Sequence, residues 1–550
     1  MYKKKFNSYI EDCIRKNWDL PALSDYHGET NCYRDIAKHI AKLHILFEQC
    51  GIKQGDKISL AGRNSSNWAI SFLATLTYGA VAVPILHEFK PDNVHNIINH
   101  SESKFLFVGD VVWEGLSADE LQNVNAIVQI NDFSFLHVKK TSATELNNTV
   151  NDIFSRKYKN GVAPDDVKYH IDASEELAMI NYTSGTTGFS KGVMLPYGSL
   201  VANLEYACTV LPQLKGGGVV SMLPMAHMYG LIFEIVFTLV SGCHIHFLTR
   251  MPTPKIILEA YSSVKPRLII SVPLIVEKIF KRKIKPLLEK PTMRFLMKVP
   301  VVKQNIKKKI MKSINNSFGD NVLVVVIGGA AFNSEAEKFF KEIGFQYTVG
   351  YGMTECGPLI SYDDWTTTHI YSCGKPIPCI QLKIDSPNPE TGIGEIIVKG
   401  ENVFSGYYKN QAATDAAFDA DGWFHTGDLG ILDSDGYLYI KGRSKNMILG
   451  PSGQNIYPEE IEDRLNNLSY INESIVINSN GKLVALIYPD YELAYSENLT
   501  DGDLEKILEN EKNELNKKLP GYSQISKIKL YPEEFEKTPK KSIKRFLYER

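Results

Sequence analysis

One segment, residues 182–192, constrains the fold most, because three glycines, several small hydroxyl side chains and one lysine directly follow an apolar run. The apolar run at residues 178–180 predicts a buried strand, so the glycine-rich loop begins at that strand's carboxyl end. Glycines let backbone N–H groups point into a concavity, hydroxyls donate to phosphate oxygens, and Lys191 supplies a positive charge. The spacing differs from a P-loop, which has four residues between its glycines and Ser or Thr after its lysine. The sequence therefore predicts a polyphosphate-binding loop; the alternative is a surface loop without a ligand.

Five further motifs follow in order. They are Pro-Met-Ala-His at 224–227, Gly-Gly-Ala at 328–330, Tyr-Gly-Met-Thr-Glu at 351–355, Thr-Gly-Asp at 426–428 and Gly-Arg-Ser-Lys at 442–445, which leads into 453–460. With the loop, they resemble the adenylate-forming superfamily of acyl-CoA synthetases, luciferases and amino-acid adenylation domains. The resemblance covers nearly the whole chain. Each motif alone is weak, whereas six in family order are specific, and they imply formation of an acyl-adenylate from a carboxylate and ATP.

Size and composition indicate an ordinary globular protein. A chain of 550 residues is too long for one core, so we expect at least two domains. The net charge of -2 gives no reason to expect nucleic acid as a partner. Eight cysteines without a Cys-x-x-Cys pair predict a reduced, cytoplasmic setting without a structural zinc site, and the N-terminus shows no secretory signal. Charged residues interrupt the apolar stretch 228–247, which predicts a buried helix and a strand rather than a membrane span.

The order of expected elements defines an α/β fold. An amphipathic helix is expected at 68–77 between strands, which is typical of a parallel sheet with crossover helices; the strands are expected at 57–61, 80–84, 105–109, 267–272 and 322–327. Short alternating strands from 392 to 440 predict a β subdomain. We expect a large domain of residues 1–442 and a small α+β domain of residues 443–550. The resemblance implies that the small domain is mobile about a hinge near Lys445, between adenylation and thioester formation.

The resemblance assigns the nucleotide site residue by residue. Thr354 donates to the α-phosphate, and Glu355 carries Mg²⁺, an ion that keeps most of its waters and so suits a lone carboxylate. The alternative for Glu355 is a solvated loop residue. The β- and γ-phosphates fall on the loop residues Thr183, Ser184, Gly185, Thr186, Thr187, Gly188 and Lys191.

The ribose and adenine fall on later motifs. Asp428 accepts hydrogen bonds from the ribose hydroxyls and Arg443 also reaches the ribose, whereas the alternative for Asp428 is turn formation beside a glycine. Tyr351 lies on or beside the adenine. Gly329 and Gly352 are assigned to the same nucleotide site.

The acyl and CoA ends are assigned by the same resemblance. His227 matches a position near the acyl carboxylate, although a histidine flanked by apolar residues is more often merely packed. Gly453 matches a glycine past which the pantetheine arm of CoA threads. Residues 224–230 offer no charged partner for a substrate ammonium, which favours an apolar acyl tail. With residues 421–428, this indicates an AMP-forming long-chain fatty acid–CoA ligase that uses fatty acid, ATP, Mg²⁺ and CoA; chain length and oligomeric state are not indicated.

One departure from the family pattern concerns catalysis. Aligned on Lys537 and Thr538, the family's catalytic lysine falls on Ser542, which can donate a hydrogen bond but carries no charge. Lys544 shares a side with Ser542 if the segment is extended, whereas Lys541 would serve in a loop. A fatty-acyl-AMP ligase or acyl-carrier-protein ligase is one alternative, because it would share every adenylation motif, although the chain has no Gly-Gly-x-Ser carrier site. A catalytically weak adenylate-binding homologue is the other.

A basic segment lies between residues 278 and 312. Its apolar stretches at 295–297 and 299–302 alternate with cations, which fits peripheral contact with an anionic membrane where fatty acids partition. The alternative is a solvated helical hairpin that packs through its apolar face. Its cations include Lys281, Arg282, Lys283, Lys285, Arg294, Lys298, Lys303, Lys307, Lys308, Lys309 and Lys312.

Overall fold

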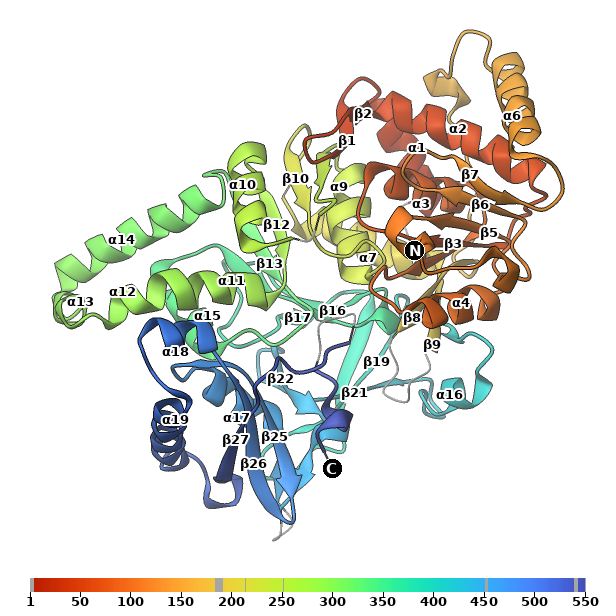
Figure 1. Cartoon of the computed structure of the whole chain (residues 1–550). Coiled ribbons are helices and arrows are strands. Elements are labelled where there is room, and N and C mark those ends of the chain that lie inside the picture. Colours follow the sequence, from red (N-terminus) through yellow and green to blue (C-terminus); the bar gives the residue numbers. More distant parts are fainter. Residues whose placement is uncertain are drawn as a thin grey trace.

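The computed structural model describes residues 4–183, 191–212, 214–250, 252–450, 454–538 and 543–549. A large body of sheets and helices is followed by a smaller C-terminal domain (Figure 1). The predicted α/β fold class is confirmed.

The largest sheet of the body has eight strands in the order β20-β9-β8-β4-β3-β5-β6-β7. Its five central strands, β8 to β6 in that order, run parallel, while β9, β20 and β7 pair antiparallel at the two edges. The strands are β3 (Lys57–Ala61), β4 (Val81–Ile85), β5 (Phe105–Val108), β6 (Ala126–Gln129), β7 (Phe135–Val138), β8 (Leu177–Thr183), β9 (Lys191–Pro196) and β20 (Gly406–Tyr407). The helices in this part of the body are α1 (Phe6–Lys16), α2 (Tyr33–Gln49), α3 (Ser66–Tyr78), α4 (Pro91–His100), α6 (Ala143–Lys157) and α7 (Tyr197–Val210).

The helix expected at 68–77 exists as α3, but it is not amphipathic. Trp68, Ile70, Phe72 and Leu73 are all fully buried although they point to different sides of the helix. The reason is that α3 lies between α2 on one side and β1, β3 and β4 on the other. A helix covered on every side needs no polar face.

Two smaller sheets, parallel except for the antiparallel pairing of β2 with β1, complete the α/β part. One sheet has the order β10-β11-β1-β2 and the other β12-β13-β14. The helix from Met228 to Val240 is buried and leads into β11, as expected, and no helix in the described part of the chain is long and apolar enough to cross a membrane. The strands are β1 (Pro21–Asp25), β2 (Thr30–Cys32), β10 (Gly218–Ser221), β11 (His244–Phe247), β12 (Leu268–Ser271), β13 (Val324–Ile327) and β14 (Tyr347–Val349).

The expected β subdomain is an antiparallel sheet of β18 (Ile380–Asp385), β19 (Gly394–Gly400), β21 (Phe424–Leu432) and β22 (Leu438–Arg443). Beside it, β15 (Tyr351–Gly352), β16 (Leu359–Tyr362) and β17 (Lys375–Pro376) form a short antiparallel sheet. The motif at 351–355 therefore begins on a strand of its own.

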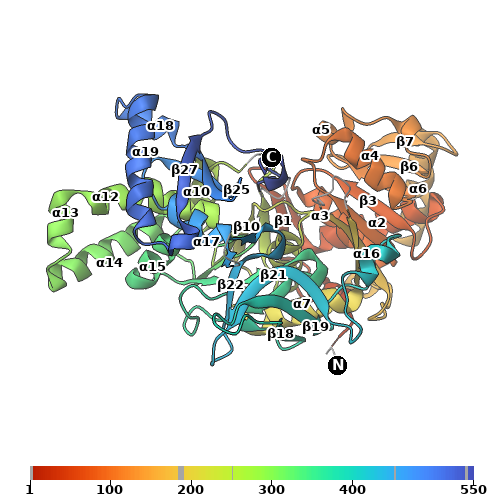
Figure 2. The ribbon, with the colours of Figure 1, turned by 90° about the horizontal axis from the view of Figure 1, so that it is seen from below.

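The small C-terminal domain has a core separate from that of the body. Leu465, Val476, Ala485 and Leu504 are buried in this second core. Its sheet of β25 (Ile471–Ser479), β26 (Lys482–Pro489) and β27 (Ile525–Leu530) packs with α17 (Pro458–Asn466), α18 (Tyr491–Ser496) and α19 (Asp501–Asn516). Figure 2 shows this domain beside the helices of the middle of the chain.

Those middle helices form an arm, residues 273–317, which we call the helical arm. It projects from the body with α13 at its far end (Figure 1). At its root, Lys281 Nζ donates to the carbonyl of Asn466 at 2.6 Å, and Lys285 Nζ donates to that of Asn467 at 2.8 Å. The arm comprises α11 (Pro273–Ile279), a π-helical turn (Phe280–Ile284), α12 (Lys285–Glu289), α13 (Pro291–Leu296) and α14 (Pro300–Ser317), between α10 (Pro254–Val264) and α15 (Ser334–Ile343).

Candidate active site

The two ends of the predicted phosphate loop lie side by side. Thr183 ends β8, Lys191 begins β9, and the two residues are paired across the antiparallel ladder. The residues between them lie outside the described part of the chain, so the roles of Ser184, Gly185, Thr186, Thr187 and Gly188 stay predictions.

A tyrosine links the loop lysine to the predicted metal carboxylate. Lys191 Nζ lies 4.6 Å from the ring centroid of Tyr407, whose hydroxyl donates to Glu355 Oε1 at 3.1 Å. The pairing of β20 with β9 sets this contact, because it aligns Tyr407 with Val193. Burial and the Glu355 carboxylate raise the pKa of Tyr407, so its hydroxyl stays protonated and donating.

Glu355 lies in a 3-10 turn, Thr354–Cys356, that follows β15. The backbone turns tightly here: a Cβ at Gly352 would lie 2.1 Å from the Pro358 carbonyl oxygen, so only glycine fits. Glu355 is 8% exposed and Thr354 is buried. Glu355 is thus a buried, hydrogen-bonded carboxylate rather than a solvated loop residue.

The metal prediction can be tested against the neighbouring side chains. Among the described residues, no group of three or more His, Cys, Asp or Glu could hold a metal ion. A single carboxylate next to a phosphate-binding loop fits Mg²⁺, which takes its remaining ligands from phosphate and water. It does not fit zinc, which requires three or four protein ligands.

At the other side of the site, each oxygen of Asp428 has a partner, one through an ion pair and one through a hydrogen bond. Arg443 Nε lies 2.9 Å from Oδ1, and the Tyr351 hydroxyl donates to Oδ2 at 2.7 Å. The β21–β22 register pairs Asp428 directly with Arg443. Asp428 is 4% exposed whereas the Arg443 side chain is 59% exposed. Asp428 therefore has partners outside its own turn. The Arg443 side chain pairs with Asp428 and is also open to solvent, where a ligand could reach it.

Burial raises the pKa of Asp428, while Arg443 and the Tyr351 hydroxyl oppose that rise. The Glu355 carboxylate adds to the rise. Tyr351, which donates to Asp428, lies on β15, and Glu355 lies in the 3-10 turn that directly follows this strand. The predicted metal end and ribose end are therefore joined through this short segment.

The segment around His227 is attached to the strand that carries the phosphate loop. Asn181 of β8 donates its amide to the carbonyl of Ala226 at 2.8 Å. His227 is half-buried, and its Nδ1 accepts the N–H of Tyr229 at 3.3 Å, which caps the short helix α8 (Met228–Gly230). Nδ1 of His227 thus has a structural role, and the catalytic role of His227 stays a prediction.

The glycine pair after β13 lies against the same segment. A Cβ at Gly328 would lie 3.1 Å from the Tyr229 ring, and the Tyr229 hydroxyl donates to the Val326 carbonyl at 3.1 Å. Gly329 is exposed with φ of +86°, a conformation that favours glycine. The turn therefore has an exposed backbone next to the His227 segment. The assignment of Gly329 to the nucleotide site stays a prediction.

The C-terminal candidates are held differently. Lys544 Nζ forms an ion pair with Glu536, and the Lys544 N–H donates to the Glu536 carbonyl at 2.9 Å. In the described part of this segment, an isolated bridge joins Lys537 and Ile543 before Lys544, and a 3-10 turn, Arg545–Leu547, follows it. The preference for Lys544 over Lys541 stays a prediction. Lys541, Ser542 and Gly453 lie outside the described residues.

Sequence reasoning missed one residue and one contact of this site. Tyr407 comes from a two-residue edge strand, and no local pattern marks it. The Tyr351 hydroxyl bond to Asp428 was also missed, because it joins residues 77 positions apart. Tyrosines near turns are too common for the sequence to show which tyrosine hydroxyl donates to a site carboxylate.

With this geometry established, comparisons with known proteins identify the family. The AMP-binding enzyme family model matches residues 10–408, and the model of the AMP-binding enzyme C-terminal domain matches residues 445–550. The chain belongs to the AMP-binding enzyme family. The resemblance to adenylate-forming enzymes is thereby confirmed.

Curated relatives are distant but extensive. A long-chain-fatty-acid–CoA ligase of Salmonella typhimurium is 27% identical, with 87% of this chain and 84% of the relative covered. Long chain acyl-CoA synthetase 4 of Arabidopsis thaliana is 26% identical over 92% of this chain and 82% of its own. FadD15, a long-chain-fatty-acid–CoA ligase of Mycobacterium bovis, is 28% identical over 78% and 72%.

Solved structures share the fold. ATP-bound MatB from Rhodopseudomonas palustris has a TM-score of 0.75 at 20% identity, covering 100% of this chain and 98% of its own. The anthranilate CoA ligase AuaEII with anthranoyl-AMP has a TM-score of 0.78 at 19% identity, covering 100% and 96%.

Proposed function

We propose that this protein activates a fatty acid with ATP and transfers it to CoA. In the first step a carboxylate oxygen attacks the α-phosphorus of ATP, giving acyl-adenylate and pyrophosphate. In the second step the thiol of CoA displaces AMP and leaves the acyl thioester. The observation that carries the proposal is the single site in which Lys191, Tyr407 and Glu355 face one end and Tyr351, Asp428 and Arg443 the other.

The residues divide the work of the first step. Asp428 and Arg443 hold the ribose, so that the triphosphate extends toward Glu355 and Lys191. Thr354 donates to the α-phosphate where negative charge develops. Mg²⁺ held by Glu355 would neutralise phosphate charge and orient pyrophosphate as the leaving group. The buried Tyr407 hydroxyl fixes the Glu355 carboxylate in place.

The acyl substrate is proposed to be a long-chain fatty acid. Three relatives carry that substrate class in their names. The segment next to the site contributes Met225 and Met228, both buried and apolar, and no charged side chain in residues 224–230. A panel of fatty acids from short to long tests this class, since an ammonium-bearing amino acid should not be activated.

We also propose that the domain boundary lies at residues 442 and 443. The two family matches leave it between 408 and 445, and the cores of the body and small domain are separate. Lys445 is exposed in the 3-10 turn Ser444–Asn446 that follows β22, where a hinge meets few packing constraints. Rotation there would exchange Lys544 near the phosphates for the path past Gly453 that CoA would take.

Two alternatives share every adenylation residue. A fatty-acyl-AMP or acyl-carrier-protein ligase delivers the acyl group to another acceptor, and a weak adenylate-binding homologue is favoured only by Ser542. One assay separates them: ATP, Mg²⁺ and a fatty acid are incubated with and without CoA, and pyrophosphate, AMP and thioester are followed. CoA-dependent thioester supports the proposal. Pyrophosphate release without thioester favours the carrier ligase, and no turnover favours the weak homologue.

The setting follows from the same chemistry. All eight cysteines are free thiols; four of them are buried and the other four are partly buried. We infer a reducing, cytoplasmic environment, in which CoA and ATP are both available.

A further inference from the structure

The far end of the helical arm exposes large apolar side chains. Phe295 on α13 is 70% exposed and Val301 at the start of α14 is 72% exposed. Leu296 and Val299 between them are also exposed. We call residues 295–301 the arm tip. Single exposed apolar residues are normal, but four within seven positions form a patch that marks an interaction surface.

The rest of the arm behaves differently. On α14, Ile310 and Ile314 are buried and Ile306 packs against the core, so this helix turns its apolar face inward. The packed-hairpin alternative therefore explains the shaft of the arm. It does not explain the arm tip, where apolar side chains face outward.

The charge of the arm points to an anionic partner. Residues 278–312 contain thirteen Lys and Arg and one acidic residue, Glu289, in a chain whose net charge is only -2. Cations near the root are engaged: Lys281 and Lys285 bind the small domain, and Lys307 pairs with Glu342 at 3.1 Å. Among the described side chains, Lys278 is exposed at the root, and the other exposed cations flank the arm tip or lie along α14; these are Lys290, Lys298, Lys308, Lys309 and Lys312.

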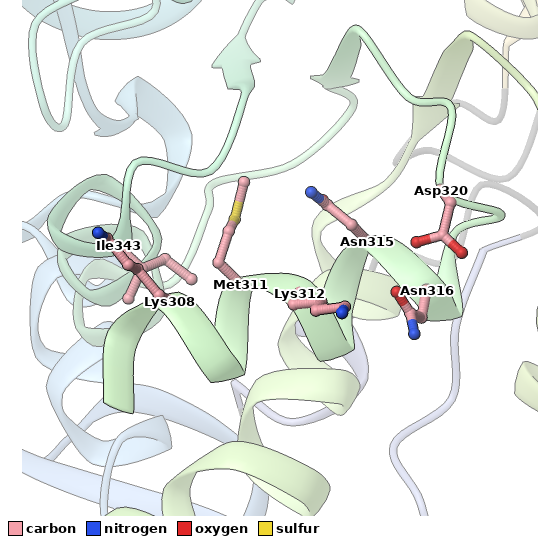
Figure 3. A pocket seen from close by; sticks show the side chains of 7 residues that line it. All are labelled: Lys308, Met311, Lys312, Asn315, Asn316, Asp320 and Ile343. Carbon is pink, nitrogen blue, oxygen red and sulfur yellow. The ribbon is translucent and has the colours of Figure 1, made fainter. Parts of the chain in front are cut away.

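Helical spacing places one residue of the arm tip and two exposed lysines on one face of α14. Val301, Lys308 and Lys312 recur seven and four positions apart along α14, which places them on the same side. Figure 3 shows Lys308 and Lys312 beside a shallow hollow of about 320 Å³. Asp320 also lines the hollow and would repel an anion there, so we assign recognition to the face as a whole.

We infer that the arm tip docks on an anionic lipid surface. Phe295 and Val301 enter the boundary between headgroups and acyl chains, and the exposed lysines lie against the headgroups. Each cation near such a surface strengthens binding about fivefold. The inference is independent of the catalytic proposal, because it rests on exposure and charge alone.

Vesicle co-sedimentation of the full chain tests the inference. We expect binding to phosphatidylcholine vesicles that contain phosphatidylglycerol, weakened by salt, and little binding to phosphatidylcholine alone. The double variant Phe295→Ser, Val301→Ser should weaken binding about tenfold or more, and Lys308→Glu with Lys309→Glu should do the same while reducing its salt dependence.

Matched controls separate docking from general effects. Ile171 is 83% exposed on a loop elsewhere, so Ile171→Ser removes an equally exposed apolar side chain. Lys506→Glu with Lys527→Glu reverses two exposed charges of the small domain. Neither should change vesicle binding. Fatty-acid activation without vesicles should stay unchanged in the arm variants, which shows that they fold.

Three results would overturn the inference. The first is no binding to either vesicle, and the second is equal loss in the arm variants and the controls. The third is a concentration-dependent dimer, seen by light scattering, that Phe295→Ser with Val301→Ser abolishes, because the tip would then serve a second copy of the chain.

Discussion

The nucleotide-facing residues of the body and the lysine-bearing segment at 537–544 are held in contrasting ways. Asp428, Glu355 and Tyr407 are buried, and each bonds to a neighbour on a paired strand or turn. Lys544 instead meets Glu536 within its own segment, next to a single isolated bridge. In the proposed mechanism, the body's part of the site is already assembled, whereas the small domain has to bring its lysine to it. In this mechanism the body binds ATP, and the small domain supplies the positive charge that promotes attack of the carboxylate on the α-phosphorus.

The largest effect should come from the preformed part. We expect Glu355→Gln to reduce fatty-acid-dependent exchange of pyrophosphate into ATP by about a thousandfold, because several kcal/mol of metal and charge stabilisation is lost. Tyr407→Phe keeps the carboxylate and removes only its hydrogen bond, so its loss should be about tenfold. Near-normal exchange in Glu355→Gln would remove the metal role of Glu355.

The next prediction concerns the lysines of the C-terminal segment. Lys544→Ala should slow adenylation about a hundredfold but leave thioester formation from preformed acyl-adenylate nearly unchanged, as single-turnover assays of each half-reaction would show. Glu536→Gln, which releases Lys544 from its ion pair, should not slow adenylation. Damage from Lys541→Ala instead would support the loop geometry. If neither lysine matters and Ser542→Lys accelerates adenylation, the weak-homologue alternative gains.

A third change addresses the ribose end. Asp428→Asn removes the charge that Arg443 and the ribose hydroxyls share, at about 1.5–3 kcal/mol, so the KM for ATP should rise about tenfold or more. Asp433→Asn, on an exposed turn of the same subdomain, is the control. An unchanged KM in Asp428→Asn would return Asp428 to a purely structural role.

The body's core also predicts a pH dependence. Burial raises the pKa of Glu234 to about 8, while Ser221 Oγ and two backbone N–H groups donate to one of its oxygens. Because the folded state holds this proton more tightly, stability should be full below about pH 4.5 and fall by about 1.4 kcal/mol for each pH unit until about pH 8. Calorimetry should show this decline, and Glu234→Gln should flatten it. The same decline in the variant would assign it to other groups.

The smallest effect concerns how the small domain is held. Lys281→Ala removes the hydrogen bond to the Asn466 carbonyl, worth about 1 kcal/mol. Limited proteolysis near the hinge should accelerate a few-fold, with adenylation little changed. Lys290→Ala, an exposed lysine farther along the arm, is the control. Identical proteolysis of both variants would show that this bond does not restrain the domain.

Local sequence patterns determined much of this protein. Apolar runs placed β3, β4, β5 and β12 within one residue of their observed bounds, because strands buried in a parallel sheet are largely apolar. Motif order alone was enough to indicate the family. The pattern at 68–77 predicted the helix but not its burial, which depends on the neighbours that cover it.

Only the tertiary structure decided which distant side chains meet. Tyr407 reaches Glu355 because an edge strand pairs with β9, more than two hundred residues away, and the Asp428–Arg443 contact depends on the β21–β22 register. It likewise decided that Ile310 faces inward while Phe295 faces outward, although both lie in the same basic segment. Periodicity and glycine chemistry act over a few residues, whereas strand pairing and burial depend on the packing of the whole chain.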